Sequence, residues 1–270
     1  MRKLLLFDVD GTLVLTGGAG VRAMNWAFER TFGRPDALRG VPLAGRTDRA
    51  ILEEAVDRAL PGVALDDGRL AAFVDRYLGR LRAEVAVDGP GKGVLPGVRP
   101  LLEHLAGRDD VELALLTGNL EGGARIKLEH FDLWRFFGWG AYGGAVTDRN
   151  ALLPVALAEA RARGLTDLDP ASVFVVGDTP SDVACARSGG ARAIAVATGP
   201  YDRAALSASG ADEVLEDLSD RAAFLQALGW PAVWRRARRG ARRGTSGDRI
   251  GGSAWESNPA LWPLSQKRRF

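Results

Sequence analysis

Short apolar runs that alternate with amphipathic stretches constrain the fold of this chain more than any other feature. Residues 4–7, 111–116, 172–176 and 193–196 are mostly apolar runs of strand length, and stretches with helical spacing separate the later ones. Runs that are apolar along most of their length are typical of parallel strands that helices cover on both faces. The pattern therefore predicts an α/β fold with a parallel sheet.

A long helical segment interrupts this alternation after the first strand. Three stretches between residues 16 and 91 carry apolar residues at helical spacing. Glycine-bearing connectors lie at the two ends of the segment, at 16–20 and 88–93, and are typical of a part that can move as a unit. We therefore predict a Rossmann-like parallel-sheet core over residues 1–15 and 92–230, with an inserted all-helical cap over residues 16–91.

Polar residues with evident chemistry follow three of the predicted strands. Ligands of a parallel sheet bind outside the carboxyl ends of its strands, so these residues are expected to meet at one edge. Four carboxylates at that edge would repel one another unless a cation were present, and oxygen donors without cysteine suit Mg²⁺. The residues are Asp8 and Asp10 after the first strand, Thr117 and Gly118 after the second, and Asp178 and Asp182 after the third.

These residue types can together perform phosphoryl transfer. An ionised aspartate can attack phosphorus and form an aspartyl-phosphate, while a second aspartate protonates the leaving alcohol and later activates water. The hydroxyl of Thr117 and the backbone N–H of Gly118, at a strand-to-helix turn, are well placed to hold phosphoryl oxygens. A lysine or an arginine would complete the charge balance around the transferring group.

Three strings, in their order and spacing, resemble motifs of the haloacid dehalogenase-like hydrolase superfamily. They are Asp8-Val9-Asp10-Gly11-Thr12, Thr117-Gly118-Asn119 and Gly177-Asp178-x-x-x-Asp182, which are similar to its first, second and fourth motifs. The resemblance runs from about residue 3 to 228, and the inserted helices resemble the helical cap of that family. Within the family, the chain is most similar to the phosphoglycolate phosphatase-like group.

The resemblance implies a role for each motif residue. Asp8 would be the nucleophile, and Asp10 the general acid and base. Thr117 and Gly118 would bind phosphate, and Asn119 either joins them or caps the next helix. The implied Mg²⁺ ligands are Asp8, the backbone carbonyl of Asp10, Asp178 and, directly or through water, Asp182.

The third motif departs from the family pattern. The family normally has a lysine at the start of the helix before the last motif strand, whereas residues 147–152 read Thr-Asp-Arg-Asn-Ala-Leu. We choose Arg149 as the catalytic cation, because arginine also matches phosphate and carboxylate geometry. Lys127 is the competitor, but its mid-helix position is typical of a solvated surface lysine.

The second aspartate indicates which reaction the family resemblance implies. Dehalogenases of this kind expel halide, which needs no proton, and they lack that residue. Asp10 therefore favours a leaving group that must be protonated, as in a phosphate monoester. We predict a Mg²⁺-dependent phosphatase for a small, phosphoglycolate-like metabolite. A sugar phosphomutase and a catalytically silent phosphate-binding protein remain open.

The substrate is expected to be selected by the cap. The stretch 43–48, Leu-Ala-Gly-Arg-Thr-Asp, is the predicted specificity loop, because it is polar and opens a cap helix. Arg46 either binds a substrate carboxylate, consistent with phosphoglycolate, or is a solvated side chain at a helix start. In the second interpretation, Asp48 lies favourably on the helix dipole.

Charge and composition limit the partners of the chain. Of the 36 basic and 34 acidic residues, ten and two lie in residues 231–270, which leaves residues 1–230 with a net charge of −6. The basic tail is predicted to be disordered, and nucleic acid is expected to bind only nonspecifically through it. The single cysteine, Cys185, and the lack of an apolar stretch of about 20 residues favour a cytoplasmic protein without a membrane segment.

Overall fold

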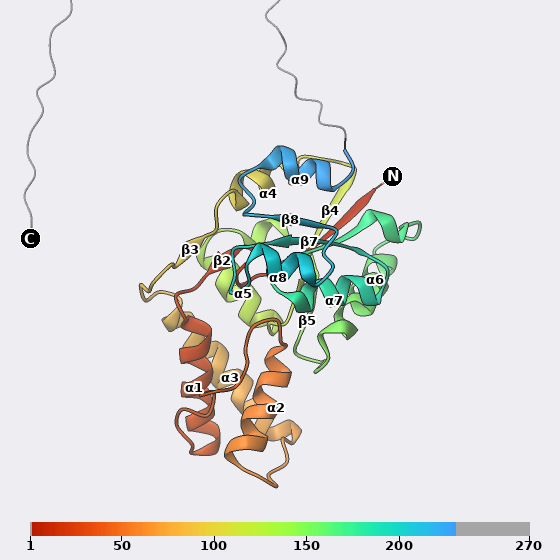
Figure 1. Cartoon of the computed structure of the whole chain (residues 1–270). Coiled ribbons are helices and arrows are strands. Elements are labelled where there is room, and N and C mark those ends of the chain that lie inside the picture. Colours follow the sequence, from red (N-terminus) through yellow and green to blue (C-terminus); the bar gives the residue numbers. More distant parts are fainter. Residues whose placement is uncertain (1, 231–270) are drawn as a thin grey trace, which may run out of the picture. The chain divides into compact units, whose positions relative to one another are not determined.

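The computed structural model describes residues 2–230 (Figure 1), so the predicted basic tail lies outside the described residues. The described part is built on a six-stranded sheet in which all neighbouring strands are parallel. In order across the sheet, the strands are β5 (Gly140–Tyr142), β4 (Val111–Thr117), β1 (Lys3–Phe7), β6 (Val173–Gly177), β7 (Arg192–Val196) and β8 (Glu213–Leu215).

Strand β1 lies at the centre of the sheet, between β4 and β6. Its last residue, Phe7, is opposite Leu115 of β4 and Val176 of β6. Because parallel strands end at the same edge, this register brings the residues that follow β1, β4 and β6 together. The three polar strand ends of the sequence therefore share one edge of the sheet.

Two apolar clusters cover the two faces of the sheet. Side chains alternate along a strand, so Leu5 and Phe7 of β1 belong to one cluster, while Leu4 and Leu6 belong to the other. Helices on each side complete these clusters, and the three layers confirm the predicted α/β class. The first cluster takes residues from α4 (Val98–Ala106), α5 (Glu121–His130) and α9 (Arg221–Ala227), and the second from α6 (Leu152–Ala162), α7 (Pro180–Ser188) and α8 (Arg203–Ala208).

Short 3₁₀ turns connect several of these elements. One of them contains Arg149, a predicted site residue. The turns are η1 (Trp134–Phe136), η2 (Arg149–Ala151) and η3 (Pro170–Ser172).

The helical segment has an apolar cluster of its own, which includes Met24, Ile51 and Phe73. Figure 1 shows its three helices together, apart from the sheet. Arg22 of the first helix donates a hydrogen bond of 2.6 Å to Glu84 at the end of the third. The division into core and cap, and the mobility of the cap, stay predictions. The helices are α1 (Ala19–Phe32), α2 (Asp48–Ala59) and α3 (Asp67–Glu84), and an antiparallel pair, β2 (Val14–Leu15) and β3 (Gly93–Val94), joins them to the sheet.

The helices of the described part were compared with the length and apolar character of a membrane span. Within residues 2–230, no helix combines the length and the apolar character needed to cross a bilayer.

Candidate active site

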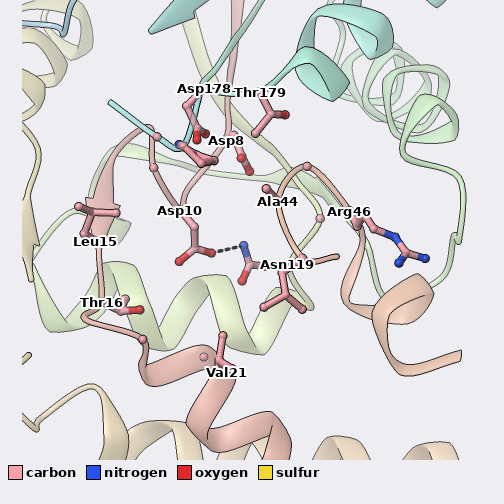
Figure 2. A pocket seen from close by; sticks show the side chains of 18 of the residues that line it. Asp8, Asp10, Leu15, Thr16, Val21, Ala44, Arg46, Asn119, Asp178 and Thr179 are labelled. Carbon is pink, nitrogen blue, oxygen red and sulfur yellow. Dashed lines mark hydrogen bonds between the residues drawn. The ribbon is translucent and has the colours of Figure 1, made fainter. Parts of the chain in front are cut away.

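Asp8 and Asp10 lie where β1 ends and the chain turns. The Asp8 side chain is buried, whereas that of Asp10 is 43% exposed and faces the cavity (Figure 2). Gly11 follows with a φ of 80°, and a Cβ atom built there would lie 2.3 Å from Oδ2 of Asp178. Only glycine combines this backbone conformation with the space that Asp178 needs. The turn thus brings the carboxylates after β1 and β6 together.

Three buried carboxylates form a group that could hold a metal ion. Oxygen atoms of Asp8, Asp178 and Asp182 all lie within 4.8 Å of one another. Thr12 donates a hydrogen bond of 3.0 Å to Asp178 and fixes its orientation. A compact set of oxygen donors fits a hard divalent cation. The Asp10 side chain is not in this group, and the predicted contribution of its backbone carbonyl stays a prediction.

The electrostatics of the group also favour a cation. Burial, partly offset by Arg149, raises the pKa of Asp8 to about 6. Burial and the neighbouring carboxylates Asp182 and Asp8 raise the pKa of Asp178 to about 8. A positive ion at this place would relieve both the desolvation and the repulsion.

These shifts predict how stability depends on pH and on metal. Both carboxyls bind protons more tightly in the folded protein than in the unfolded chain, where the pKa of aspartate is about 3.9. The stability that these protons give is complete below that value and is lost as the pH rises through about 6 for Asp8 and about 8 for Asp178. We expect the metal-free protein to be less stable at pH 8 than at pH 5, and Mg²⁺ to raise the melting temperature more at pH 8.

Thermal unfolding with EDTA or Mg²⁺ at the two pH values measures this effect. The variant Asp178→Asn serves as the matched control, because it removes one titrating carboxyl and should reduce the difference between the two Mg²⁺ shifts. Equal Mg²⁺ shifts at pH 5 and pH 8 in the unaltered protein would contradict the prediction.

Arg149 is the cation that faces Asp8. It opens η2, is 7% exposed, and its Nη2 lies 3.2 Å from Oδ2 of Asp8. The same nitrogen donates a hydrogen bond to Asp182. Its Nε is buried and finds no hydrogen-bond partner among the described residues. The geometry supports the choice of Arg149, although its catalytic role stays a prediction.

Lys127 also lies at the site, and the expectation that it is a solvated surface lysine is wrong. Its side chain is only 4% exposed, and Nζ lies 2.5 Å from Oδ2 of Asp10. Nζ also donates a hydrogen bond of 2.6 Å to Oδ1 of Asn119. Arg149 and Lys127 therefore do not compete for one position, because each contacts a different aspartate of the first motif.

Thr117, Gly118 and Asn119 form the turn after β4. Thr117 is buried, and its hydroxyl accepts a hydrogen bond of 2.8 Å from Nδ2 of Asn119. Asn119 does not cap the next helix, because Leu120 occupies the N-cap of α5 and no side chain bonds there. Instead, Asn119 donates a hydrogen bond of 2.9 Å to Asp10 (Figure 2). Phosphate binding by these three residues stays a prediction.

Arg46 points away from the carboxylates (Figure 2). Its guanidinium forms an ion pair with Glu54 and donates a hydrogen bond of 3.3 Å to the carbonyl of Ala50. Arg46 also lines the cavity, but its guanidinium does not point at the carboxylates, and its role as a carboxylate clamp stays a prediction. Arg46 is not a freely solvated side chain either, because Glu54 holds it along α2.

Asp48, the first residue of α2, makes contacts that the sequence does not predict. Its backbone N–H donates to the carbonyl of Gly118 at 2.7 Å, and its carboxylate accepts from the N–H of Leu120 at 2.8 Å. Thr47, the N-cap of α2, donates from its hydroxyl to the carbonyl of Thr147 at 3.1 Å. The start of α2 thus contacts the turn after β4 through Asp48 and the segment after β5 through Thr47.

A cavity of about 610 Å³ joins these residues to the helical segment. Its volume suits a small metabolite. Its polar residues include Asp8, Asp10 and Asp178 together with Asn119, Lys127 and Arg149. Its lining also includes the large, mostly apolar residues Leu15, Val21, Met24, Leu43, Ile51 and Tyr77.

Comparison with known proteins shows the family of this chain. The family model described as haloacid dehalogenase-like hydrolase matches residues 5–187. The chain is 32% identical to a phosphoglycolate phosphatase of Synechococcus elongatus, over 84% of this chain and 97% of that protein. It is 29% identical to the probable phosphatase IndB of Dickeya dadantii, over 84% of this chain and 95% of IndB.

Solved structures give the same fold. A crystal structure of a predicted phosphoglycolate phosphatase from Haemophilus somnus superposes with a TM-score of 0.61, at 21% identity, over 83% of this chain and 98% of that one. At this identity the likeness shows the fold alone. The family model and the curated relatives carry the conclusion that this chain belongs to the haloacid dehalogenase-like hydrolase family.

Proposed function

We propose that this protein is a phosphatase that hydrolyses phosphate monoesters of small metabolites through a phosphoryl group carried on Asp8. The observation that carries the proposal is the buried group of Asp8, Asp178 and Asp182 with Arg149 against it, beside a cavity that Asp8, Asp10, Asp178 and Arg149 line. Several relatives are named phosphoglycolate phosphatases, so phosphoglycolate is the first metabolite to test.

The chemistry divides between the two aspartates after β1. A carboxylate oxygen of Asp8 attacks phosphorus as the bond to the leaving oxygen breaks, and Asp10 gives its proton to that oxygen. In the second half, water attacks the phosphorus of the aspartyl-phosphate as the bond to the Asp8 oxygen breaks, Asp10 takes a proton from that water, and phosphate and the free Asp8 carboxylate result. Arg149 balances the negative charge beside Asp8, and the Thr117 hydroxyl and the Gly118 N–H hold phosphoryl oxygens.

The metal that we propose is Mg²⁺, held by Asp8, Asp178 and Asp182. Only oxygen donors are present in this group, and Mg²⁺ is usually bound through a few carboxylates. When bound, it would neutralise the charge on the phosphoryl oxygens and on the attacking carboxylate.

The direct test of the function is hydrolysis of p-nitrophenyl phosphate with and without Mg²⁺, followed by a panel of metabolite phosphates that includes phosphoglycolate. We expect turnover that EDTA removes and Mg²⁺ restores. A catalytically silent phosphate-binding protein would release no p-nitrophenol. A sugar phosphomutase would transfer the phosphoryl group from a sugar bisphosphate to a sugar phosphate rather than to water.

The contacts of Arg46 predict the outcome of its removal. Because Glu54 holds the guanidinium away from the carboxylates, Arg46→Ala should change the KM for phosphoglycolate by less than about twofold, within the range of surface substitutions. Steady-state kinetics measure this, with Arg49→Ala, three residues later in the chain and within α2, as the control. A tenfold or larger increase in KM confined to Arg46→Ala would restore the carboxylate-clamp interpretation.

A further inference from the structure

One oxygen of the Asp10 carboxylate is held from two sides. Oδ2 accepts a hydrogen bond of 2.5 Å from Nζ of Lys127 and one of 2.9 Å from Nδ2 of Asn119. Lys127 and Asn119 are also bonded to each other, at 2.6 Å from Nζ to Oδ1. No other side-chain hydrogen bond to Asp10 is found in residues 2–230, so both donors of this closed triangle converge on Oδ2.

Burying the ammonium group of Lys127 costs free energy. A lysine that is 4% exposed loses most of its hydration, and a single buried ion pair seldom offsets that loss. A purely structural pair would also bury its carboxylate, yet the Asp10 side chain is 43% exposed. The lysine is therefore buried, while its partner faces the cavity in which the substrate would lie.

Within residues 2–230, Asp10 is the one carboxylate that forms an ion pair with Lys127. Lys127 also acts on Asp48, where burial raises the pKa to about 6 and the charge of Lys127 partly offsets this rise. The Asp48 carboxylate is, however, engaged by the N–H of Leu120 at 2.8 Å. Lys127 and Asp10 thus form the direct ion pair.

We propose that Lys127 and Asn119 are positioning residues for Asp10, which fix Oδ2 so that Oδ1 performs the proton transfers. The inference rests on the proposed phosphatase function. In the first half-reaction, the O–H bond at Oδ1 breaks and the proton moves to the leaving oxygen as that oxygen separates from phosphorus. The electron pair left on Asp10 is stabilised by the ammonium of Lys127. In the second half-reaction, Oδ1 receives a proton from the attacking water.

If Lys127 and Asn119 position Asp10, the effect of replacing them should depend on the leaving group of the substrate. A purely structural role would not give this dependence. Proton donation matters most when the leaving group is a strong base, such as the alkoxide from ethyl phosphate. It matters little for p-nitrophenolate, which leaves readily without a proton. The ratio kcat/KM reports the steps through phosphoryl transfer to Asp8, so it isolates the step in which Asp10 acts as an acid.

The experiment compares Lys127→Met and Asn119→Ala with the unaltered protein on ethyl phosphate, phosphoglycolate and p-nitrophenyl phosphate. For Lys127→Met we expect kcat/KM on both alkyl phosphates to fall about 100-fold, the lower end of what general acid catalysis contributes. The loss on p-nitrophenyl phosphate should stay within about threefold, well below that contribution. Asn119→Ala should show the same order of losses. Arg125→Met is the matched control, because Arg125 lies two residues earlier on α5 and its side chain is 60% exposed.

The alternatives give different results. Equal losses on all three substrates would show that Lys127 only supports the fold, and would overturn the proposal. A loss confined to phosphoglycolate would overturn it as well, because Lys127 would then bind the substrate carboxylate. If Lys127→Met does not fold, Asn119→Ala decides between these outcomes. Absence of turnover in the unaltered protein would instead refute the proposed function itself.

Discussion

Replacing Asp8 with Asn is expected to lower kcat on p-nitrophenyl phosphate by at least about 10⁴-fold, in the range found when an enzyme loses its nucleophile. The amide keeps the shape of the side chain but cannot attack phosphorus. Asp8 also belongs to the buried carboxylate group, so the substitution removes one charge from the predicted metal site.

Controls separate the loss of the nucleophile from a loss of fold. Asp109→Asn changes an exposed aspartate outside the site and should leave turnover unaltered. The melting temperature of Asp8→Asn should change little, because burial already disfavours the charged form and raises the pKa of Asp8 to about 6, and Arg149 keeps its ion pair with Asp182. An Asp8→Asn variant that keeps more than a tenth of the activity would exclude Asp8 as the nucleophile.

Replacing Arg149 with Ala is expected to have the second largest effect. We expect kcat/KM on p-nitrophenyl phosphate to fall about 10³-fold, as when an enzyme loses a group that stabilises transition-state charge. The guanidinium contacts both Asp8 and Asp182, and all three side chains are buried. Removing one partner of a buried ion pair typically costs about 3–5 kcal/mol of stability. We therefore expect a lower melting temperature, which Mg²⁺ should partly restore.

The comparison with Lys127 makes this prediction specific. On the aryl ester, Lys127→Met should lose little, because that leaving group needs no proton. Arg149→Lys should recover part of the lost activity, while Arg161→Ala, an exposed arginine of α6, is the control. A larger loss on the aryl ester from Lys127→Met than from Arg149→Ala would show that the two cations have been assigned to the wrong roles.

The sequence predicts the sheet and its polar edge because both depend on local patterns. The apolar runs at 111–116 and 172–176 become β4 and β6, with bounds that differ by a single residue at one or both ends. Both strands lie beside β1 in the parallel sheet, so the polar residues that follow the three strands meet at one edge. The pattern misses β8 and α8, because three and six residues are too few for a clear period.

The side chains that the sequence does not place correctly, or leaves open, are those whose contacts depend on the tertiary structure. Lys127 has ordinary helical neighbours, and its burial depends on Asp10, which is 117 residues away. Asn119 resembles a helix cap by position, yet its side chain bonds across to the turn after β1. Arg46 depends on Glu54, a residue of the same helical segment that competes with any substrate for the guanidinium. None of these partners can be read from local spacing.

The measurement that tests the account most directly is a rapid acid quench during turnover of a phosphate monoester, followed by mass spectrometry of the peptides. We predict that one phosphoryl group is found on the peptide that contains Asp8 and that it is absent from Asp8→Asn. In Asp10→Asn, the phosphorylated peptide should accumulate with p-nitrophenyl phosphate, because the attacking water then lacks its base. The central claim that Asp8 carries the transferred group would be contradicted if the enzyme were active but no peptide were phosphorylated. It would also be contradicted if the phosphoryl group were found on another residue.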